Sequence, residues 1–234
     1  NLVDEKKRKL DAIRLADAVK VGDTLELEWI YHSNALEGSI LRKFEIKIIL
    51  QGLKTGFMSP HDNLDILNHR QAIRYIEINN KEEVSQSAIK SLHNTLQEGI
   101  DNENAGQYRN ENVFTVGEKH TPPHHSLVPN QMKKLMEWYK TTARQLHPVE
   151  RAAKLHVLFL GIKPFIDDNG RLARLILNWE LMQEGYPPIV IRKQDCRAYY
   201  KAVDNALALG EYRGFMVMMV AALNRSLDFY LKAA

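Results

Sequence analysis

Hydrophobic residues recur every three or four positions along most of this chain, and short groups of Gly, Pro, Asn or Ser separate the periodic segments. This period is typical of amphipathic helices, because one face of each helix must be buried. The pattern predicts helices over residues 10–29 with a break at Gly22, 44–53, 63–79, 85–96, 131–146, 149–162, 170–184, 195–209 and 212–231. We therefore expect a mainly α-helical fold.

Residues 112–117 depart from this pattern. They read Asn-Val-Phe-Thr-Val-Gly, and Thr121-Pro122-Pro123 follows shortly after them. β-Branched and aromatic residues bounded by turn-forming residues favour a strand, and a proline-rich segment ends one. We expect a small β-hairpin here, within an otherwise helical chain.

The composition is that of a globular protein. Of the 234 residues, 44% are hydrophobic and 26% are charged, which is sufficient for one large core. No linker or internal repeat divides the chain, so we expect a single domain over residues 1–234. The net charge is only +3 and cationic residues are scattered among acids along the sequence, which argues against nucleic-acid binding.

Three features bear on the compartment. The longest apolar run, residues 215–223, is shorter than the ~18 residues of a membrane-spanning helix, so no membrane association is expected. The only cysteine, Cys196, excludes an intrachain disulfide. The first residues also lack the apolar core of a signal peptide. We expect a cytoplasmic protein.

Candidate chemistry concentrates where two predicted helices meet. Pro164 ends the first helix, because proline restrains the residue before it and lacks an N–H. Asp168, Asn169 and Gly170 form a turn, and the second helix follows directly. Its N-terminus presents unpaired amides and the positive end of the helix dipole, which together favour a phosphate.

Charged side chains flank this turn. Arg171 and Arg174 lie three residues apart on the first turn of the second helix and can add guanidinium contacts to a phosphate. Asp167 can contribute one carboxylate to Mg²⁺ while phosphates supply other ligands. The local alternative is an ordinary turn with solvated arginines, and the local chemistry leaves both interpretations open.

The whole segment 163–174, Lys-Pro-Phe-Ile-Asp-Asp-Asn-Gly-Arg-Leu-Ala-Arg, resembles the signature of the Fic (filamentation induced by cAMP) family. That signature reads His-Pro-Phe-x-Asp/Glu-Gly-Asn-Gly-Arg-x-x-Arg. The sequence departs from it at Lys163, where the family has His, and at Asp168, where it has the first Gly. Other segments are also similar to Fic proteins, namely 26–38, 68–72, 106–109, 115–117, 121–123, 147–153 and 185–188. The resemblance therefore covers nearly the whole chain.

The resemblance implies a Fic fold, which is a helical bundle around the helix–loop–helix motif with a small β-hairpin flap. It divides the single domain into an N-terminal helical region with an inhibitory motif (1–60), a Fic core (85–205) and a C-terminal helix (206–234). It implies AMP transfer from ATP, with Mg²⁺, to a hydroxyl of a target protein. No tightly bound cofactor is expected, and a homodimer is an open alternative to a monomer.

The resemblance also assigns nucleotide-binding roles. Asp167 matches the metal-binding position, and the backbone of Asp168, Asn169 and Gly170 matches the anion hole for the phosphates. Arg174 matches the arginine that binds the γ-phosphate. Arg171, Tyr199 and Tyr200 complete the expected nucleotide site, with the two tyrosines preceding a position near the adenine.

Two further groups of residues are implied. Ser33 and Glu37 match the inhibitory motif Ser/Thr-x-x-x-Glu-Gly/Asn, in which the glutamate pairs with the final arginine and blocks a productive ATP pose. If residues 33–38 are helical, Ser33 and Glu37 lie one turn apart on one face. Thr115, Val116 and Gly117 match the flap that clamps the target.

The departures bear on the chemistry. The family histidine is a general base, whereas a lysine amine ordinarily carries a proton at pH 7 and cannot accept another. Lys163 is therefore expected to act as a cation. Asp168 is expected to place a negative charge in the anion hole, and Leu207 stands where relatives have an Asn near the adenine.

Three functions follow as alternatives. The first is a protein adenylyltransferase scaffold inhibited by Glu37, with weak or lost transfer. The second is a non-catalytic module that senses nucleotide or binds a protein partner. The third is phosphotransfer with an altered nucleotide pose.

Overall fold

The computed structural model describes residues 2–13, 22–53, 59–114 and 119–233. Within these residues the chain forms ten α-helices and three short 3-10 helices, and no strand occurs. The α-helices are α1 (Leu2–Ile13), α2 (Asp23–Leu36), α3 (Lys43–Leu50), α4 (Pro60–Ile78), α5 (Gln86–Gln97), α6 (Val128–Lys140), α7 (Pro148–Ile162), α8 (Asn169–Gln183), α9 (Cys196–Leu209) and α10 (Arg213–Ala233).

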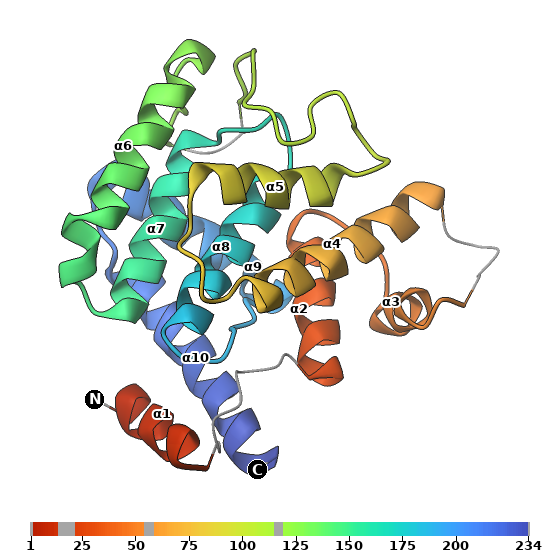
Figure 1. Cartoon of the computed structure of the whole chain (residues 1–234), viewed down its shortest axis with the longest axis vertical. Helices are drawn as coiled ribbons and strands as arrows, with labels where there is room; N and C mark the ends of the chain where they lie inside the picture. The colour runs from red at the N-terminus through yellow and green to blue at the C-terminus, as the bar shows by residue number, and fades with distance from the viewer. Residues whose placement is uncertain (1, 14–21, 54–58, 115–118, 234) are drawn as a thin grey trace.

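Helices α7 and α8 lie at the centre of the molecule, and the other helices surround them (Figure 1). Both are buried on most of their surface, and α8 buries residues continuously from Arg171 to Met182. Trp179 and Phe159 are fully buried between these helices and their neighbours. Because both helices are buried on nearly all sides, this pair forms the core.

The loop between the two central helices, residues 163–168, is called the motif loop below. Lys163 ends α7 with φ 45° and Asp168 precedes α8 with φ 61°. In the described part of the chain these are the only residues other than glycine with positive φ. Left-handed backbone is unfavourable for L-residues, so both ends of the loop are held by surrounding contacts.

Most predicted helices are confirmed to within a few residues. The predicted break at Gly22 is confirmed, because α2 begins at Asp23, but the predicted limits at 10 and 29 are wrong, because α1 begins at Leu2 and α2 runs to Leu36. Val3 and Leu10 are buried, and α1 packs against α10, so a contact between the two ends of the chain stabilises a helix that begins before the predicted one.

The prediction for residues 131–146 is also wrong at its end. Helix α6 stops at Lys140, and a 3-10 helix over Thr142–Gln145 leads toward α7. Ala143 is buried in this tighter turn. The turn lets the chain reverse before Pro148, which occupies the first position of α7, where proline is favoured.

The β-hairpin prediction falls largely outside the described residues. Residues 112–114 have no regular secondary structure, and the proposed flap residues Thr115, Val116 and Gly117 lie in the segment that the structure does not describe. In the described ranges no helix is long and apolar enough to cross a membrane.

Candidate active site

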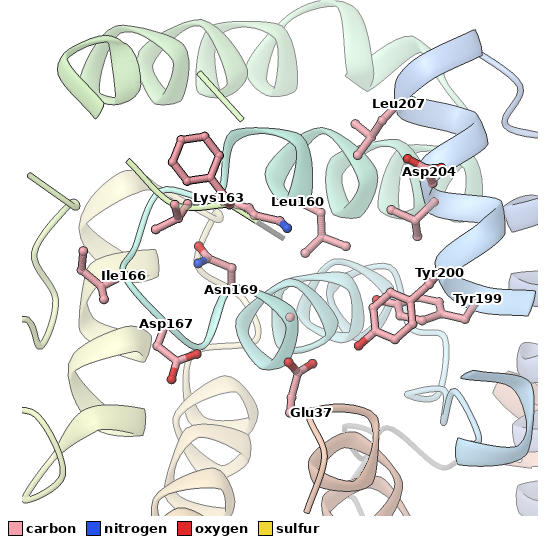
Figure 2. Close-up of a pocket in the computed structure, with 14 residues that line it drawn as sticks. Glu37, Leu160, Lys163, Ile166, Asp167, Asn169, Tyr199, Tyr200, Asp204 and Leu207 are labelled. Atoms are coloured by element: carbon pink, nitrogen blue, oxygen red, sulfur yellow. The ribbon is translucent and has the colours of Figure 1, made fainter. Parts of the chain in front are cut away.

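A pocket of about 480 Å³ opens beside the motif loop, between the end of α2, the start of α8 and the face of α9 (Figure 2). Its volume lies in the range of small-molecule sites. The lining residues are Glu37, Val113, Phe114, Leu160, Lys163, Ile166, Asp167, Asn169, Gly170, Tyr199, Tyr200, Val203, Asp204 and Leu207. The pocket therefore contains most of the residues that the sequence assigns to nucleotide binding.

The motif loop is held by its own polar groups. The Asn169 side chain accepts a hydrogen bond from the Phe165 backbone N–H at 3.1 Å and donates one to the Phe165 carbonyl at 2.8 Å. Asp167 Oδ1 accepts from the Asp168 N–H at 2.7 Å. Phe165 is fully buried and stacks on His93 with ring centroids 3.8 Å apart. These contacts pre-organise the loop.

Glu37 lies at the N-terminus of α8. It follows the last residue of α2, and Figure 2 shows its carboxylate directed toward the start of α8. The carboxylate is so close to Gly170 that a Cβ at that position would overlap it. A side chain at position 170 would therefore displace the Glu37 carboxylate, which places an anion where the helix dipole favours one.

Arg174 binds the same carboxylate. Its Nη2 donates to Glu37 Oε1 at 2.7 Å and to the Ser33 carbonyl at 2.9 Å, and its Nε donates to Ser33 Oγ at 2.8 Å. Burial disfavours the charge of Arg174, but Glu37 holds its pKa above the ordinary value. The contact expected between Glu37 and Arg174 is therefore present, and Ser33 supports it from one turn earlier in α2.

Arg171 differs from its expected role. Its guanidinium donates to the Asp168 carboxylate, to Asn34 Oδ1 at 3.0 Å and to Asp65 Oδ1 at 2.8 Å. The side chain is only 10% exposed and does not line the pocket. Arg171 joins the motif loop to α2 and α4, so it does not reach a phosphate from this position. Sequence reasoning missed Asn34 and Asp65, which no local pattern marks.

Asp168 also points away from the pocket. Its carboxylate is 1% exposed, pairs with Arg171 and accepts a hydrogen bond from Gln97 Nε2 at 2.7 Å. Burial raises the pKa of Asp168 to about 6, although Arg171 opposes that rise. The expectation that this residue puts a negative charge into the anion hole is wrong, because α5 and α8 supply partners for the carboxylate outside the pocket.

This burial predicts a pH dependence of stability. Because the pKa of Asp168 is higher in the folded chain than in the unfolded one, its contribution is complete at low pH and is lost as pH rises through about 6. Between pH ~4 and ~6, the ionisation of Asp168 should lower the free energy of unfolding by up to ~3 kcal/mol. Asp168→Asn should abolish this part of the pH dependence. Urea denaturation at several pH values measures this. Asn tolerates left-handed backbone, so the loop geometry is kept.

The exposed Glu103 provides the control. Glu103→Gln should leave the pH profile of stability as it is in the unmodified chain. If Asp168→Asn has the same profile as the unmodified chain, the carboxylate does not titrate in this environment.

The pocket charges are mostly negative. Lys163 is the only Lys or Arg among the described lining residues, and Figure 2 shows its amine directed into the pocket. Glu37, Asp167 and Asp204 supply three carboxylates. This balance disfavours a free polyphosphate and makes Lys163 the one side-chain cation that an anion would meet among these residues.

The two tyrosines have different environments. Tyr200 donates its hydroxyl hydrogen bond to the Leu36 carbonyl at 2.9 Å, which ties α9 to the end of α2. Tyr199 is fully buried, and its hydroxyl lies 3.0 Å from His156 Nε2. Burial raises the pKa of Tyr199 to about 12. His156 is a hydrogen-bonded core residue, as its apolar sequence context indicates.

Asp204 is a site residue that the sequence did not reveal. Its Oδ1 accepts hydrogen bonds from the backbone N–H groups of Lys119 at 2.8 Å and His120 at 3.3 Å. His120 Nε2 in turn lies 2.8 Å from the Gly161 carbonyl. Helix α9 therefore anchors the chain just after the proposed flap, and Leu207 packs over Gly161 at the same edge.

Known proteins share this sequence pattern and this fold. The profile of the Fic/DOC family matches residues 83–181. A Fic domain-containing signalling protein from Bacteroides thetaiotaomicron superimposes with a TM-score of 0.87 at 30% identity, covering 99% of this chain and 96% of that one. Residues 134–508 of Fic-1 from C. elegans give a TM-score of 0.86 at 25% identity, covering 99% of this chain and 70% of that one. The chain belongs to the Fic/DOC family.

Curated relatives are named for an activity. The "Protein adenylyltransferase Fic" of Drosophila grimshawi is 31% identical over 237 residues, covering 99% of this chain and 48% of that protein. The protein of the same name from Nematostella vectensis is 31% identical over 236 residues, covering 98% of this chain and 55% of that protein. The chain thus spans about half the length of these relatives.

Proposed function

We propose that this chain is a Fic-type protein adenylyltransferase scaffold that Glu37 holds in an inhibited arrangement. Its reaction would transfer AMP from ATP to a hydroxyl side chain of a target protein. The observation that carries the proposal is the position of the Glu37 carboxylate, which binds Arg174 and covers Gly170 at the start of α8. The names of the curated relatives support the same reaction.

The proposed substrate is ATP with Mg²⁺. The amides at the start of α8 and the guanidinium of Arg174 would hold its phosphates once Glu37 moves away. Asp167 lines the same pocket and has a carboxylate of the kind that binds Mg²⁺ together with phosphate oxygens. Tyr200, Val203 and Leu207 line the remaining part of the pocket, where we place the base.

Removal of the proton from the target hydroxyl limits the rate of the proposed reaction. Transfer requires a group that accepts this proton as the oxygen attacks the α-phosphate. At that position the chain has Lys163, and a protonated amine has no lone pair to offer. We therefore propose that transfer is slow even when ATP is bound.

Lys163 also favours a second candidate function. An ammonium that projects into a pocket attracts a phosphate by its charge, even though it cannot remove a proton. On this alternative the chain binds nucleotide without transferring any part of it, and acts as a nucleotide-sensing or protein-interaction module.

Removing the carboxylate at position 37 should strengthen nucleotide binding. We expect weak binding of Mg²⁺-ATP by the unmodified chain and at least ~10-fold tighter binding by Glu37→Gly, because a like charge leaves the phosphate site. Isothermal titration calorimetry measures both affinities. Glu37→Gln is the matched variant, since it keeps the size of the side chain and removes only its charge.

The affinities of the three proteins show whether the charge or the size of the Glu37 side chain weakens nucleotide binding. If Glu37→Gln binds as tightly as Glu37→Gly, repulsion between carboxylate and phosphate is the cause of inhibition. Equal, tight binding by all three proteins would contradict inhibition by Glu37.

Radiolabelled ATP separates the proposed functions. Label from the α-phosphate on protein indicates adenylyl transfer, and label from the γ-phosphate indicates phosphotransfer. If Glu37→Gly binds ATP and neither label reaches protein, the chain is a nucleotide-binding module.

A further inference from the structure

A second groove lies away from the motif loop. It runs between residues 24–32 of α2, the segment 190–194 and residues 222–229 of α10, and it shares no lining residue with the pocket described above. Its volume of about 460 Å³ is close to the 480 Å³ of that pocket. A cavity of this size can hold a small molecule.

The groove is positively charged. Arg192, Arg225 and Lys43 line it, and Glu28 is the only carboxylate among the described residues that line it. Glu28 is already engaged, since Lys43 Nζ lies 2.5 Å from its Oε1 and His32 Nε2 lies 3.3 Å from its Oε2.

The two arginines therefore carry charge that this carboxylate does not neutralise. In the part of the chain that the structure describes, neither guanidinium makes a salt bridge. Burial and the nearby charge of Arg192 lower the pKa of Arg225, while Asp195 opposes the shift. Burial also holds the pKa of His32 below its ordinary value, so this histidine adds no charge at pH 7.

The other walls of the groove are of mixed character. Leu25 and Val190 are apolar, and Phe229 presents an aromatic ring that is partly exposed. Thr24 and Ser226 add hydroxyl groups. Two guanidinium groups beside an apolar wall suit a dianion that is attached to an apolar body, because guanidinium forks match phosphate oxygens.

We propose that this groove binds a small phosphorylated compound, with its phosphate between Arg192 and Arg225 and its apolar body against Leu25 and Phe229. Phosphate is favoured over a carboxylate because it offers charge and acceptor oxygens to two guanidinium groups at once.

The groove is connected to the inhibitory contact through α2. The Lys193 backbone N–H donates to His32 Nδ1 at 3.1 Å, and the next residue, Ser33, accepts two hydrogen bonds from Arg174. A ligand that contacts α2, segment 190–194 and α10 together stabilises this arrangement of α2, because binding to one arrangement raises its population. The ligand should thus strengthen inhibition by Glu37, a regulatory role that rests on the proposed function.

Calorimetry with three probes tests the binding site. We expect phenyl phosphate to bind more tightly than inorganic phosphate, and phenol to bind more weakly than either. Arg225→Ala and Arg192→Ala should each weaken phenyl phosphate binding about tenfold or more, which corresponds to one charge-assisted contact. Arg213→Ala, an exposed arginine at the start of α10, is the matched control and should leave binding unchanged.

A further variant assigns the binding to the groove. Lys163→Ala alters the pocket beside the motif loop and should not change the affinity for phenyl phosphate. The proposal is overturned if Lys163→Ala weakens binding while the two groove variants do not, or if phenyl phosphate does not bind at all.

Hydrogen exchange tests the connection to α2 without any measurement of transfer. Saturating phenyl phosphate should slow amide exchange in α2 of the unmodified chain and have no such effect in Arg225→Ala. Unchanged exchange in α2, with phenyl phosphate bound, would overturn the regulatory role. Because this readout needs no ATP, it remains valid if the chain proves not to be an adenylyltransferase.

Discussion

Replacing Lys163 with His in a Glu37→Gly background is expected to raise the rate of AMP transfer by about 10²- to 10⁴-fold, the usual contribution of a general base. Glu37→Gly opens the phosphate site in both proteins that are compared. The added histidine can accept the proton of the target hydroxyl, because a neutral imidazole is populated at pH 7. Lys163 projects into the same pocket, so the ring can reach the same space.

Transfer is measured as the initial rate at which label from α-phosphate-labelled ATP enters protein, in the chain itself and in added cell extract. Lys163→Ala in the same background is the control for loss of the amine alone, and it should remain slow. Rapid transfer by Glu37→Gly with Lys163 in place would contradict this prediction.

Asp168→Gly should contribute much less to this recovery. Its carboxylate is buried outside the pocket and paired with Arg171 and Gln97, so removing it does not remove a charge from the phosphate site. A large further gain from Asp168→Gly would mean that the loop rearranges when nucleotide binds.

Replacing Arg171 with Ala is expected to lower the free energy of unfolding by about 3–5 kcal/mol, the usual cost of leaving a buried charge unpaired. Arg171 is the cation bonded to both Asp168 and Asp65, and Asp168 is 1% exposed. The loss should be smaller below pH ~6, because Asp168 then takes up a proton more readily.

Urea denaturation at pH ~5 and ~7 measures this effect. The double variant with Asp168→Asn should recover part of the lost stability, since it removes the carboxylate that Arg171 neutralises. Arg213→Ala, on the surface of α10, should change stability by less than ~0.5 kcal/mol. A similarly small effect of Arg171→Ala would show that the buried pair is not required for the fold.

The helices, the motif loop and the start of α8 could be predicted from sequence, because they depend on residues that are close together in the chain. The period of apolar positions marked α4, α5, α7, α8 and α10 to within a few residues, and Pro164 indicated where α7 ends. The one-turn spacing of Ser33 and Glu37 likewise predicted that both would face a common partner, and both contact Arg174.

The directions of the motif side chains were decided only by the tertiary structure. The motif predicts that Asp168 and Arg171 belong to a phosphate site, but Gln97 and Asp65 bind them from helices far away in the sequence. A buried charge must find a partner wherever the fold supplies one. The local sequence therefore determined which residues form the loop and the helix start, whereas packing against α2, α4 and α5 determined which of them face the pocket.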